Sequence, residues 1–489
     1  MSTLDQTAGQ VRQLVGELAG SLAGHPAKQT VDAIAERLDG PLRVAIAGRV
    51  KAGKSTLLNA LVGERLAPTD AGECTKIVTR YQYGDQYGIV AEMRTGGPRT
   101  LAFTRGEAAL KIELAGAGEA DIRYLTVRWP SSVLRETMLI DTPGLASINA
   151  ENSRRTVDFV QGDDGSGAGE VDAVIYLMRH AHREDLRFLD AFMDRGVSSS
   201  SAVNAIGVLS RADEIGAGRL DAMESAGRIA ARYAADRDLA RLVSGVLPLA
   251  GLLAETGLTL IEEEAAAIRA VAAIDPLALE RMLLSAQTFS DGEVDGVSVD
   301  ARRRLLERLG VFGVRISVDL VRSQGLRTAA DLGPRLVEIS GLSELRERIS
   351  HQFGPRARVL QARSALVSLR ALAKDLESSA PDQARRISYE CERIEASAAE
   401  FARIRAAYLV SSGLVELRDD EQSELNRLLL GQSAAEALGV PAGSVRAAAL
   451  DGVTKWRTRA EDPFVDPATR EACEAGARTC EVFYAAVGG

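Results

Sequence analysis

The chain has 489 residues, of which 46% are hydrophobic and only 4% aromatic, and its formal net charge is −9. This length corresponds to about two to four domains, and the apolar share is sufficient for large cores. An acidic chain has no long-range attraction to nucleic acid or to an anionic membrane, so we expect no nucleic-acid partner.

Cysteine usage and hydropathy indicate a cytoplasmic protein. Cys74, Cys391, Cys473 and Cys480 are scattered without zinc-ligand spacing, which is typical of reduced thiols. The first residues show no basic segment before an apolar run, so no secretory signal is predicted. The longest apolar stretch, residues 242–261, is broken by glycine, proline and glutamate, and it predicts no membrane span.

In chain order, the first predicted elements are two amphipathic helices within residues 4–39, where apolar residues recur at helical spacing. Gly40 and Pro41 end the second helix. The apolar run 42–47 then predicts a buried strand, which is followed by a glycine-rich turn and a helix over residues 55–62. These elements form a strand–loop–helix unit.

From this unit to about residue 251, strand-like and helix-like segments alternate. The predicted strands cover residues 77–83, 124–129, 137–140, 173–178 and 205–209, and helices are predicted at 183–193 and 219–236. This alternation predicts an α/β domain with a mainly parallel sheet and helices on both faces.

Beyond about residue 255 the strand signals stop and helical periodicity continues to the end. An apolar stripe from Val359 to Leu376 predicts a long helix, and further helices are predicted over residues 382–409, 421–430, 442–460 and 466–486. The fold class is therefore α/β plus all-α.

The segment Gly48–Ser55 fits the phosphate-binding pattern G-x-x-x-x-G-K-[ST]. Its glycines let backbone N–H groups wrap a phosphate, and the helix that follows directs its positive end to the same place. Lys54 should reach the β- and γ-phosphates, and the Ser55 hydroxyl should ligate Mg²⁺. The pattern alone occurs by chance, but its context here is the required one.

The next motif is MLIDTPG, residues 138–144. A buried strand delivers Asp141 to the carboxyl edge of the sheet, where ligands of open α/β sheets bind. Asp141 would hold the magnesium ion and the Gly144 N–H would sense the γ-phosphate. Taken alone, D-T-P-G is an ordinary turn; after a phosphate-binding loop it is the expected second half of a magnesium site.

The third motif is SRAD, residues 210–213, at the end of another predicted strand. The usual GTPase form is Asn or Thr, then Lys, x, Asp. Asp213 can accept two hydrogen bonds from guanine, whereas adenine lacks that donor pair, and the stem of Arg211 can stack on the base. Taken alone, SRAD could equally be a helix N-cap, but its order after the other motifs favours guanine recognition.

A threonine that senses the γ-phosphate should lie between the first two motifs. Thr69, Thr75 and Thr79 are the candidates, and Thr75 fits best because it lies just before a predicted strand. Thr79 is better explained as a strand residue and Thr69 as a turn residue. Thr75 would complete the magnesium ligands with Ser55 and Asp141.

Together, these motifs and the segments 41–79, 210–223, 305–317 and 340–349 resemble the bacterial dynamin-like GTPases over most of the chain. The resemblance implies GTP or GDP and Mg²⁺ as ligands and a dimer formed through the GTPase domain, with itself or with a paralogue. It also implies that hydrolysis is coupled to membrane remodelling, with peripheral contact at the inner face of the plasma membrane.

The resemblance implies a division into N-terminal helices (1–40), a GTPase domain (41–352) with helical additions at about 255–340, and a helical bundle (353–489) that the N-terminal helices join. The segment 246–251, with Ala250, would supply the last base-contacting loop. The complete set of predicted nucleotide contacts is Gly48, Arg49, Val50, Lys51, Ala52, Gly53, Lys54, Ser55, Thr56, Asp141, Gly144, Ser210, Arg211, Asp213 and Ala250.

The sequence departs from eukaryotic dynamins within the phosphate loop, where Gln and Ser are replaced by Val50 and Lys51. Val50 cannot orient an attacking water. Lys51 could place a positive charge near the β–γ bridging oxygen, or it is only a solvated loop residue. Lys51, Lys54 and Thr75 are therefore the predicted catalytic residues, and slow basal turnover is expected.

No apolar hairpin suited to lipid insertion is recognisable after residue 355. The turn at 409–415 is the best candidate tip, although a buried helix–helix connection is the preferred interpretation.

A dynamin-like GTPase is the leading hypothesis. The alternatives are a GTP-dependent module that docks a paralogous partner with little hydrolysis, a ribosome- or RNA-associated GTPase, which the acidic balance disfavours, and an ATPase.

Overall fold

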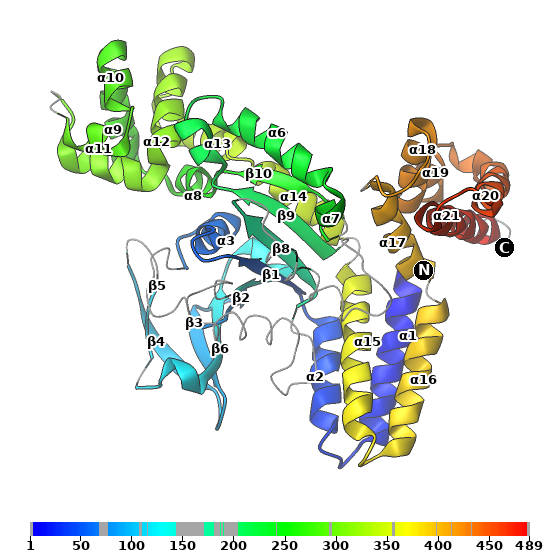
Figure 1. The fold of residues 1–489 in the computed structure, drawn as a ribbon. Coiled ribbons are helices and arrows are strands. Elements are labelled where there is room, and N and C mark those ends of the chain that lie inside the picture. Colours follow the sequence, from blue (N-terminus) through cyan, green and yellow to red (C-terminus); the bar gives the residue numbers. More distant parts are fainter. Residues whose placement is uncertain are drawn as a thin grey trace.

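The computed structural model describes residues 3–67, 77–106, 110–114, 116–142, 171–179, 186, 189, 204–240, 242–292, 296–354, 357–397, 399–411, 413–431 and 433–486. At its centre lies a ten-stranded sheet with the order β10-β9-β8-β1-β7-β2-β6-β3-β4-β5 (Figure 1). The strands are β1 Leu42–Gly48, β2 Thr79–Tyr83, β3 Gly88–Met93, β4 Arg99–Arg105, β5 Leu110–Glu113, β6 Ile122–Trp129, β7 Thr137–Asp141, β8 Ala173–Met178, β9 Ala205–Ser210 and β10 Val246–Leu249.

The sheet is mixed but mostly parallel, as the sequence predicted. Strands β10, β9, β8, β1 and β7 pair in parallel, as do β2 and β6, whereas β2–β7, β6–β3, β3–β4 and β4–β5 are antiparallel. The antiparallel extension β3–β5 was not predicted. In β4, only Leu101 is fully buried, so this strand has no apolar run to signal it.

Helices cover both faces of the parallel half. Val44 and Ile46 of β1 point into a core shared with α3 (Lys54–Val62), α8 (Gly251–Thr259) and α14 (Leu342–Phe353). Ala45 and Ala47, on the opposite face, pack with α6 (Ala222–Ala234) and α7 (Arg237–Ala240). The alternation of side chains along a strand explains why this β1 segment is apolar throughout.

A helical arm projects from the sheet at the side of β10 (Figure 1). It consists of α9 Glu262–Ala272, α10 Pro276–Met282, α11 Ala286–Asp291 and α12 Val299–Gln324, with α13 Ala329–Ile339 at its base. These helices share a core with the start of α8, including Ala250 and Leu253. Helix α12 bends at Gly310, which has φ 64° and ψ −179°.

The remaining helices form two hydrophobic cores where the sequence suggested one bundle. The first joins both ends of the chain: α1 (Thr3–Ser21) and α2 (Lys28–Asp39) pack with α15 (Ala357–Leu376) and α16 (Pro381–Ser397). The second contains α17 Ala399–Ser411, α18 Asp419–Leu430, α19 Ala434–Leu438, α20 Val445–Glu461 and α21 Pro467–Ala486. The helix predicted over 382–409 corresponds to α16 and α17, which belong to different cores.

The described residues of the turn at 409–415 agree with the interpretation preferred from the sequence, which is a buried connection between two helices. Leu409 and Leu414 are half-buried against the core beneath α6 and α7, and Val410 and Val415 are buried in the C-terminal core. Within the described parts of the chain, no helix is both long enough and apolar enough to cross a bilayer.

The bundle is attached to the sheet by a buried ion pair at the amino end of β8. Arg37 of α2 lies 3.4 Å from Asp172, and both side chains are buried. The other carboxylate oxygen of Asp172 accepts a hydrogen bond from the Arg43 N–H of β1 at 2.9 Å. Strand β1 therefore begins at the bundle and ends, at Gly48, in the phosphate-binding motif.

Candidate functional site

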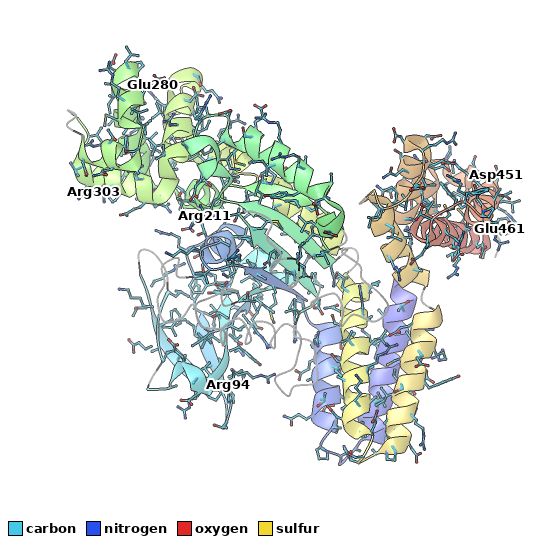
Figure 2. All side chains as sticks on the ribbon, viewed as in Figure 1. Arg94, Arg211, Glu280, Arg303, Asp451 and Glu461 are labelled. Carbon is cyan, nitrogen blue, oxygen red and sulfur yellow. The ribbon has the colours of Figure 1, made fainter. Side chains whose placement is uncertain are left out.

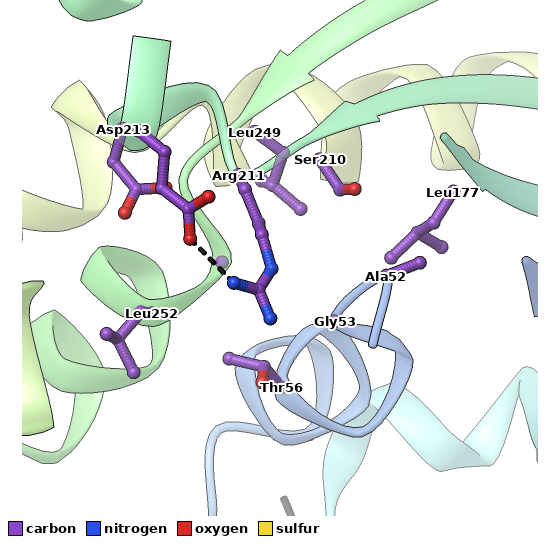
Figure 3. A pocket seen from close by; sticks show the side chains of 11 residues that line it. Ala52, Gly53, Thr56, Leu177, Ser210, Arg211, Asp213, Leu249 and Leu252 are labelled. Carbon is purple, nitrogen blue, oxygen red and sulfur yellow. Dashed lines mark hydrogen bonds and ion pairs between the residues drawn. The ribbon is translucent and has the colours of Figure 1, made fainter. Parts of the chain in front are cut away.

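The predicted motifs meet at the carboxyl edge of the parallel half of the sheet, where β1, β7, β9 and β10 end. A cavity of about 150 Å³ lies there (Figure 3). It is lined by Ala52, Gly53, Thr56, Leu177, Ser210, Arg211, Asp213, Glu214, Leu249, Gly251 and Leu252. The cavity thus joins the loop after β1 with the loop after β9, two segments far apart in the sequence.

The phosphate-binding motif has the backbone that its glycines predict. Gly48 and Gly53 have φ values of 149° and 91°, and a Cβ atom at Gly48 would lie 2.5 Å from the Leu177 carbonyl oxygen. Helix α3 begins at Lys54, so its unpaired N–H groups face the loop. Lys51 also has a positive φ, 62°, and its side chain is exposed, as is that of Val50.

Lys54 folds back over this loop. Its Nζ donates hydrogen bonds to the carbonyl oxygens of Gly48, at 3.3 Å, and of Arg49, at 3.2 Å. Burial lowers the pKa of Lys54, while the nearby Asp141 carboxylate acts in the opposite direction. The ammonium group is therefore poorly compensated inside the loop, which favours an anion there.

Ser55 and Asp141 are brought together from different elements. The Ser55 hydroxyl donates to Asp141 Oδ2 at 3.2 Å, and Asp141 ends β7 directly beside Ile46 of β1. The other oxygen, Oδ1, is buried and has no hydrogen-bond partner among the described residues. Burial raises the pKa of Asp141 to about 6, and Lys54 and Ser55 only partly oppose this. A hydroxyl beside an unsatisfied carboxylate oxygen fits Mg²⁺, which prefers hard oxygen ligands.

The SRAD segment forms the opposite wall of the cavity. Ser210 ends β9, and its hydroxyl donates to the Met178 carbonyl oxygen at 3.3 Å. Arg211 has the unusual φ of 53°, and its guanidinium group lies 2.6 Å from Glu214 Oε1. Figure 3 shows this side chain extending across the cavity towards Thr56. Glu214 also pairs with Arg179.

Asp213 is positioned to act as an acceptor in this cavity (Figure 3). Burial raises its pKa to about 6; a backbone hydrogen bond opposes the shift, and the neighbouring Glu214 adds to it. A carboxylate held in a desolvated site favours a ligand that presents N–H donors. Guanine presents two such donors on one edge.

The segment 246–251 also reaches the cavity, but not through Ala250. Leu249, Gly251 and Leu252 line it, and a Cβ atom at Gly251 would lie 3.6 Å from Thr56 Cγ2. Ala250 is buried in the core of the arm, and its N–H donates to the Ser340 carbonyl oxygen at 2.9 Å. Its assignment as a nucleotide contact stays a prediction.

Two predicted site residues, Thr75 and Gly144, lie outside the described residues, as does the alternative Thr69. Thr79 is the first residue of β2, as expected for a strand residue, and its hydroxyl donates to the Ile77 carbonyl oxygen at 3.3 Å. The sequence had not indicated Leu177, Glu214 or Leu252, and it had indicated Leu249 only as part of the segment 246–251. Leu177 lies in a predicted strand, and Glu214 directly follows SRAD. The sequence therefore predicted the segments that contain or adjoin these residues but not their place in the site.

Comparison with known proteins gives a consistent result. The model of the dynamin family matches residues 44–181. The isoniazid-induced protein IniC of Mycobacterium tuberculosis is 38% identical over 493 aligned residues, which cover 98% of this chain and 98% of IniC. A bacterial dynamin-like protein of Nostoc punctiforme is 29% identical over 181 residues, covering 34% of this chain and 25% of that protein.

Among solved structures, a chain described as part of an oligomerised bacterial dynamin pair, with a role in long-range sensing and tethering of membranes, covers 98% of this chain. It is 12% identical, 90% of its own length is covered, and the TM-score is 0.32.

Proposed function

Because the chain belongs to the dynamin family, we propose that it binds GTP and hydrolyses it to GDP and phosphate in a magnesium-dependent reaction. The observation that carries this proposal is that the phosphate loop, the Ser55–Asp141 pair and Asp213 all lie at the carboxyl edge of one sheet, where the loop and Asp213 line the same cavity. The proposed GTPase domain comprises residues 41–352, between the N-terminal helices (1–40) and the C-terminal helical region (353–489).

In the proposed mechanism, the main chain of residues 48–53 and the α3 N-terminus bind the phosphates, and Lys54 neutralises their charge. Ser55 and Asp141, with Thr75 as a further candidate, would hold Mg²⁺, which when bound supplies electrostatic stabilisation of the transferring phosphoryl group. Asp213 accepts from the guanine edge and Arg211 stacks on the base. Lys51, exposed beside the loop, supplies positive charge at the bridging oxygen.

Activation through a paired GTPase domain, either as a homodimer or with a paralogous protein, is a further part of the proposal. It is supported by Val50, which is 47% exposed in the phosphate loop and has no group that could orient a water. A second subunit would be needed to complete the catalytic site. The strand β1 links this site to the helical bundle through Arg43 and Asp172, which provides a path from hydrolysis to bundle movement at a membrane surface.

The test is GTP turnover per molecule over a hundredfold range of protein concentration, with and without anionic liposomes. We expect the rate per molecule to increase with concentration, because pairing completes the site, and to increase again with liposomes. A slow rate that stays flat under all conditions contradicts self-activation.

The same observation at Val50 favours one alternative, a GTP-dependent switch that docks a paralogous partner with little hydrolysis of its own. Single-turnover kinetics separate the two functions. A switch would bind GTP tightly and retain it at every protein concentration, whereas the proposed GTPase would convert it to GDP as pairing increases.

A further inference from the structure

A network of buried polar side chains lies beside the nucleotide site, on the side of the helical arm. It begins at Asn59, which is 1% exposed in α3, the helix that follows the phosphate loop. Asn59 Oδ1 accepts from the N–H groups of Leu66 and Ala67 at 2.9 and 2.8 Å, and Nδ2 donates to the Ala67 carbonyl oxygen at 3.1 Å. Asn59 therefore fixes the chain that leaves α3.

The remaining Asn59 interaction reaches Glu255. Asn59 Nδ2 lies 3.4 Å from Glu255 Oε2, which completes the hydrogen-bonding capacity of the amide. Glu255 is 1% exposed and pairs with Arg65 Nε at 2.7 Å. An acidic side chain so deeply buried requires both partners. Glu255 lies on α8, one turn after Leu252, which lines the cavity.

Glu255 also faces the helical arm through Arg308 of α12. The Arg308 guanidinium approaches Glu255 Oε1 at 3.9 Å, pairs with Glu264 of α9 at 2.8 Å, and donates to the Thr259 hydroxyl at 2.7 Å. Both Arg308 and Glu264 are largely buried, with side chains 11% and 18% exposed. Arg308 thus joins α8, α9 and α12.

Gly310, two residues after Arg308 in α12, lies at the end of the cavity where Asp213 is expected to bind the base. A Cβ atom at Gly310 would lie 3.8 Å from Asp213 Oδ2 and 3.9 Å from Leu252. Helix α12 therefore lies beside Asp213 at Gly310, and through Arg308 it approaches Glu255, which contacts Asn59 of α3. Figure 2 shows Arg211 near the root of the arm, with Glu280 and Arg303 farther out on it.

We propose that Asn59, Glu255 and Arg308 are positioning residues that couple the nucleotide site to the helical arm α9–α12. They hold residues 65–67 and α3 in a fixed position relative to α12. Nucleotide binding should therefore reduce the local opening of the arm, and a substitution that loosens the arm should lower nucleotide affinity. Such coupling is reciprocal by thermodynamic linkage. This inference rests on the proposed guanine-nucleotide site.

The test compares two matched variants of α12 in the full-length protein. R308K keeps the charge but loses the guanidinium contacts to Glu264 and Thr259, whereas R304K makes the same change in an exposed pair with Glu263 one turn earlier. GDP affinity, with Mg²⁺ present, is measured by calorimetry. Hydrogen exchange of residues 305–312 is measured with and without GDP.

We expect GDP to slow exchange in this segment of the wild type and of R304K, and to have a much smaller effect in R308K. We also expect R308K to bind GDP about fivefold or more weakly, the lower end of typical coupling between sites, and R304K to bind it like the wild type. If R308K does not fold, T259V removes one Arg308 contact in its place, and a smaller shift in the same direction is expected.

Identical GDP affinity and identical exchange in R308K and R304K overturn the coupling, as does a wild-type arm whose exchange ignores bound GDP. A wild type that binds no guanine nucleotide would instead contradict the proposed function itself, so the two failures are distinguishable.

Discussion

The two ends of the proposed nucleotide site differ in the kind of group that would contact the ligand. At the phosphate end, the contacts are predicted from backbone N–H groups and from Lys54, Ser55 and Asp141, which are already in contact with one another or with the loop. At the base end, they are predicted from the side chains of Arg211 and Asp213, on a loop where Arg211 is paired with Glu214.

This difference shows why the two motifs depart from the common GTPase pattern to different degrees. Main-chain N–H groups bind a phosphate where glycines allow the loop to turn around it. Phosphate binding by the first motif is therefore compatible with Val50 and Lys51 at the other positions of the loop. At the base end every substitution changes a contacting group. The shorter Ser210 is used within the sheet, on Met178, and Arg211 engages Glu214, so we expect the phosphate end to supply most of the affinity.

Replacing Lys54 should have the largest effect on this comparison. Lys54→Ala removes the buried cation of the phosphate end, and GTP affinity should fall about 100-fold or more, since losing one partner of a desolvated charge pair costs about 2–5 kcal/mol. Isothermal calorimetry measures the affinity, with the melting temperature as the control for folding. Retained affinity would show that the base end, not the phosphate end, dominates binding.

Asp213→Asn should have the next largest effect, because it changes specificity without touching the phosphate end. The preference for GDP over XDP should shift by about 10- to 100-fold towards XDP, as expected for one hydrogen bond to a charged group. Competition against a fluorescent nucleotide measures the ratio. Glu214→Gln, next to it on the same loop, is the matched control, and an unchanged preference in Asp213→Asn would contradict the base-reading role.

A pH series separates the two ends without mutation. The pKa of Asp213 is raised from 3.8 to about 6 by burial, so this group stabilises the unliganded fold below pH 3.8, and that contribution is lost as pH rises through 6. Guanine binding needs the ionised carboxylate. The preference for GDP over IDP, which lacks the exocyclic amine, should therefore decrease by about severalfold as pH falls below about 6.

The titrations of the phosphates and of Asp141 do not change the ratio of GDP affinity to IDP affinity. Both nucleotides carry the same phosphates and would lie against the same Asp141. Equilibrium binding at several values between pH 7.5 and pH 5 provides the measurement. A ratio that stays constant over this range would place the titrating group elsewhere.

The smallest effect is expected from Glu214→Gln. It releases Arg211 from a half-exposed ion pair, and such pairs contribute about 0–1 kcal/mol. GDP affinity should rise by no more than about fivefold, because Arg211 becomes free to stack on the base. Calorimetry at low and high salt checks this, and a loss of affinity would mean that Glu214 holds Arg211 in its binding position.

The buried part of the fold was accessible from sequence because its strands are continuous apolar runs. Strands β1, β7, β8 and β9 were predicted within about two residues. The strand β10 was missed because Pro248 interrupts it, which an edge strand tolerates. The extension β3–β5 was missed because buried residues are interspersed in it with half-buried or exposed ones, so its strands are not continuous apolar runs. The two cores of the helical region could not be separated, since helical periodicity shows which face is buried but not against which helix.

At the candidate site, the sequence indicated residues whose role depends on local pattern, such as Gly48, Gly53 and Lys54. It could not indicate pairings made only by the tertiary fold. Asn59 and Glu255 are 196 positions apart, and nothing in their neighbourhoods distinguishes them from ordinary helix residues. The same applies to Arg37 and Asp172, whose ion pair attaches the bundle to the sheet.

The separate core of α17–α21 has a consequence for how this protein loses its structure. Its buried residues, such as Trp456 and Cys473, pack among themselves. Among the residues that the structure describes, Leu409 and Leu414 of the 409–415 turn also pack against the core beneath α6 and α7. Units with independent cores open at different free energies, so heating should produce more than one transition. Susceptibility to proteases would then be set by the least stable unit, even while the proposed nucleotide site remains intact.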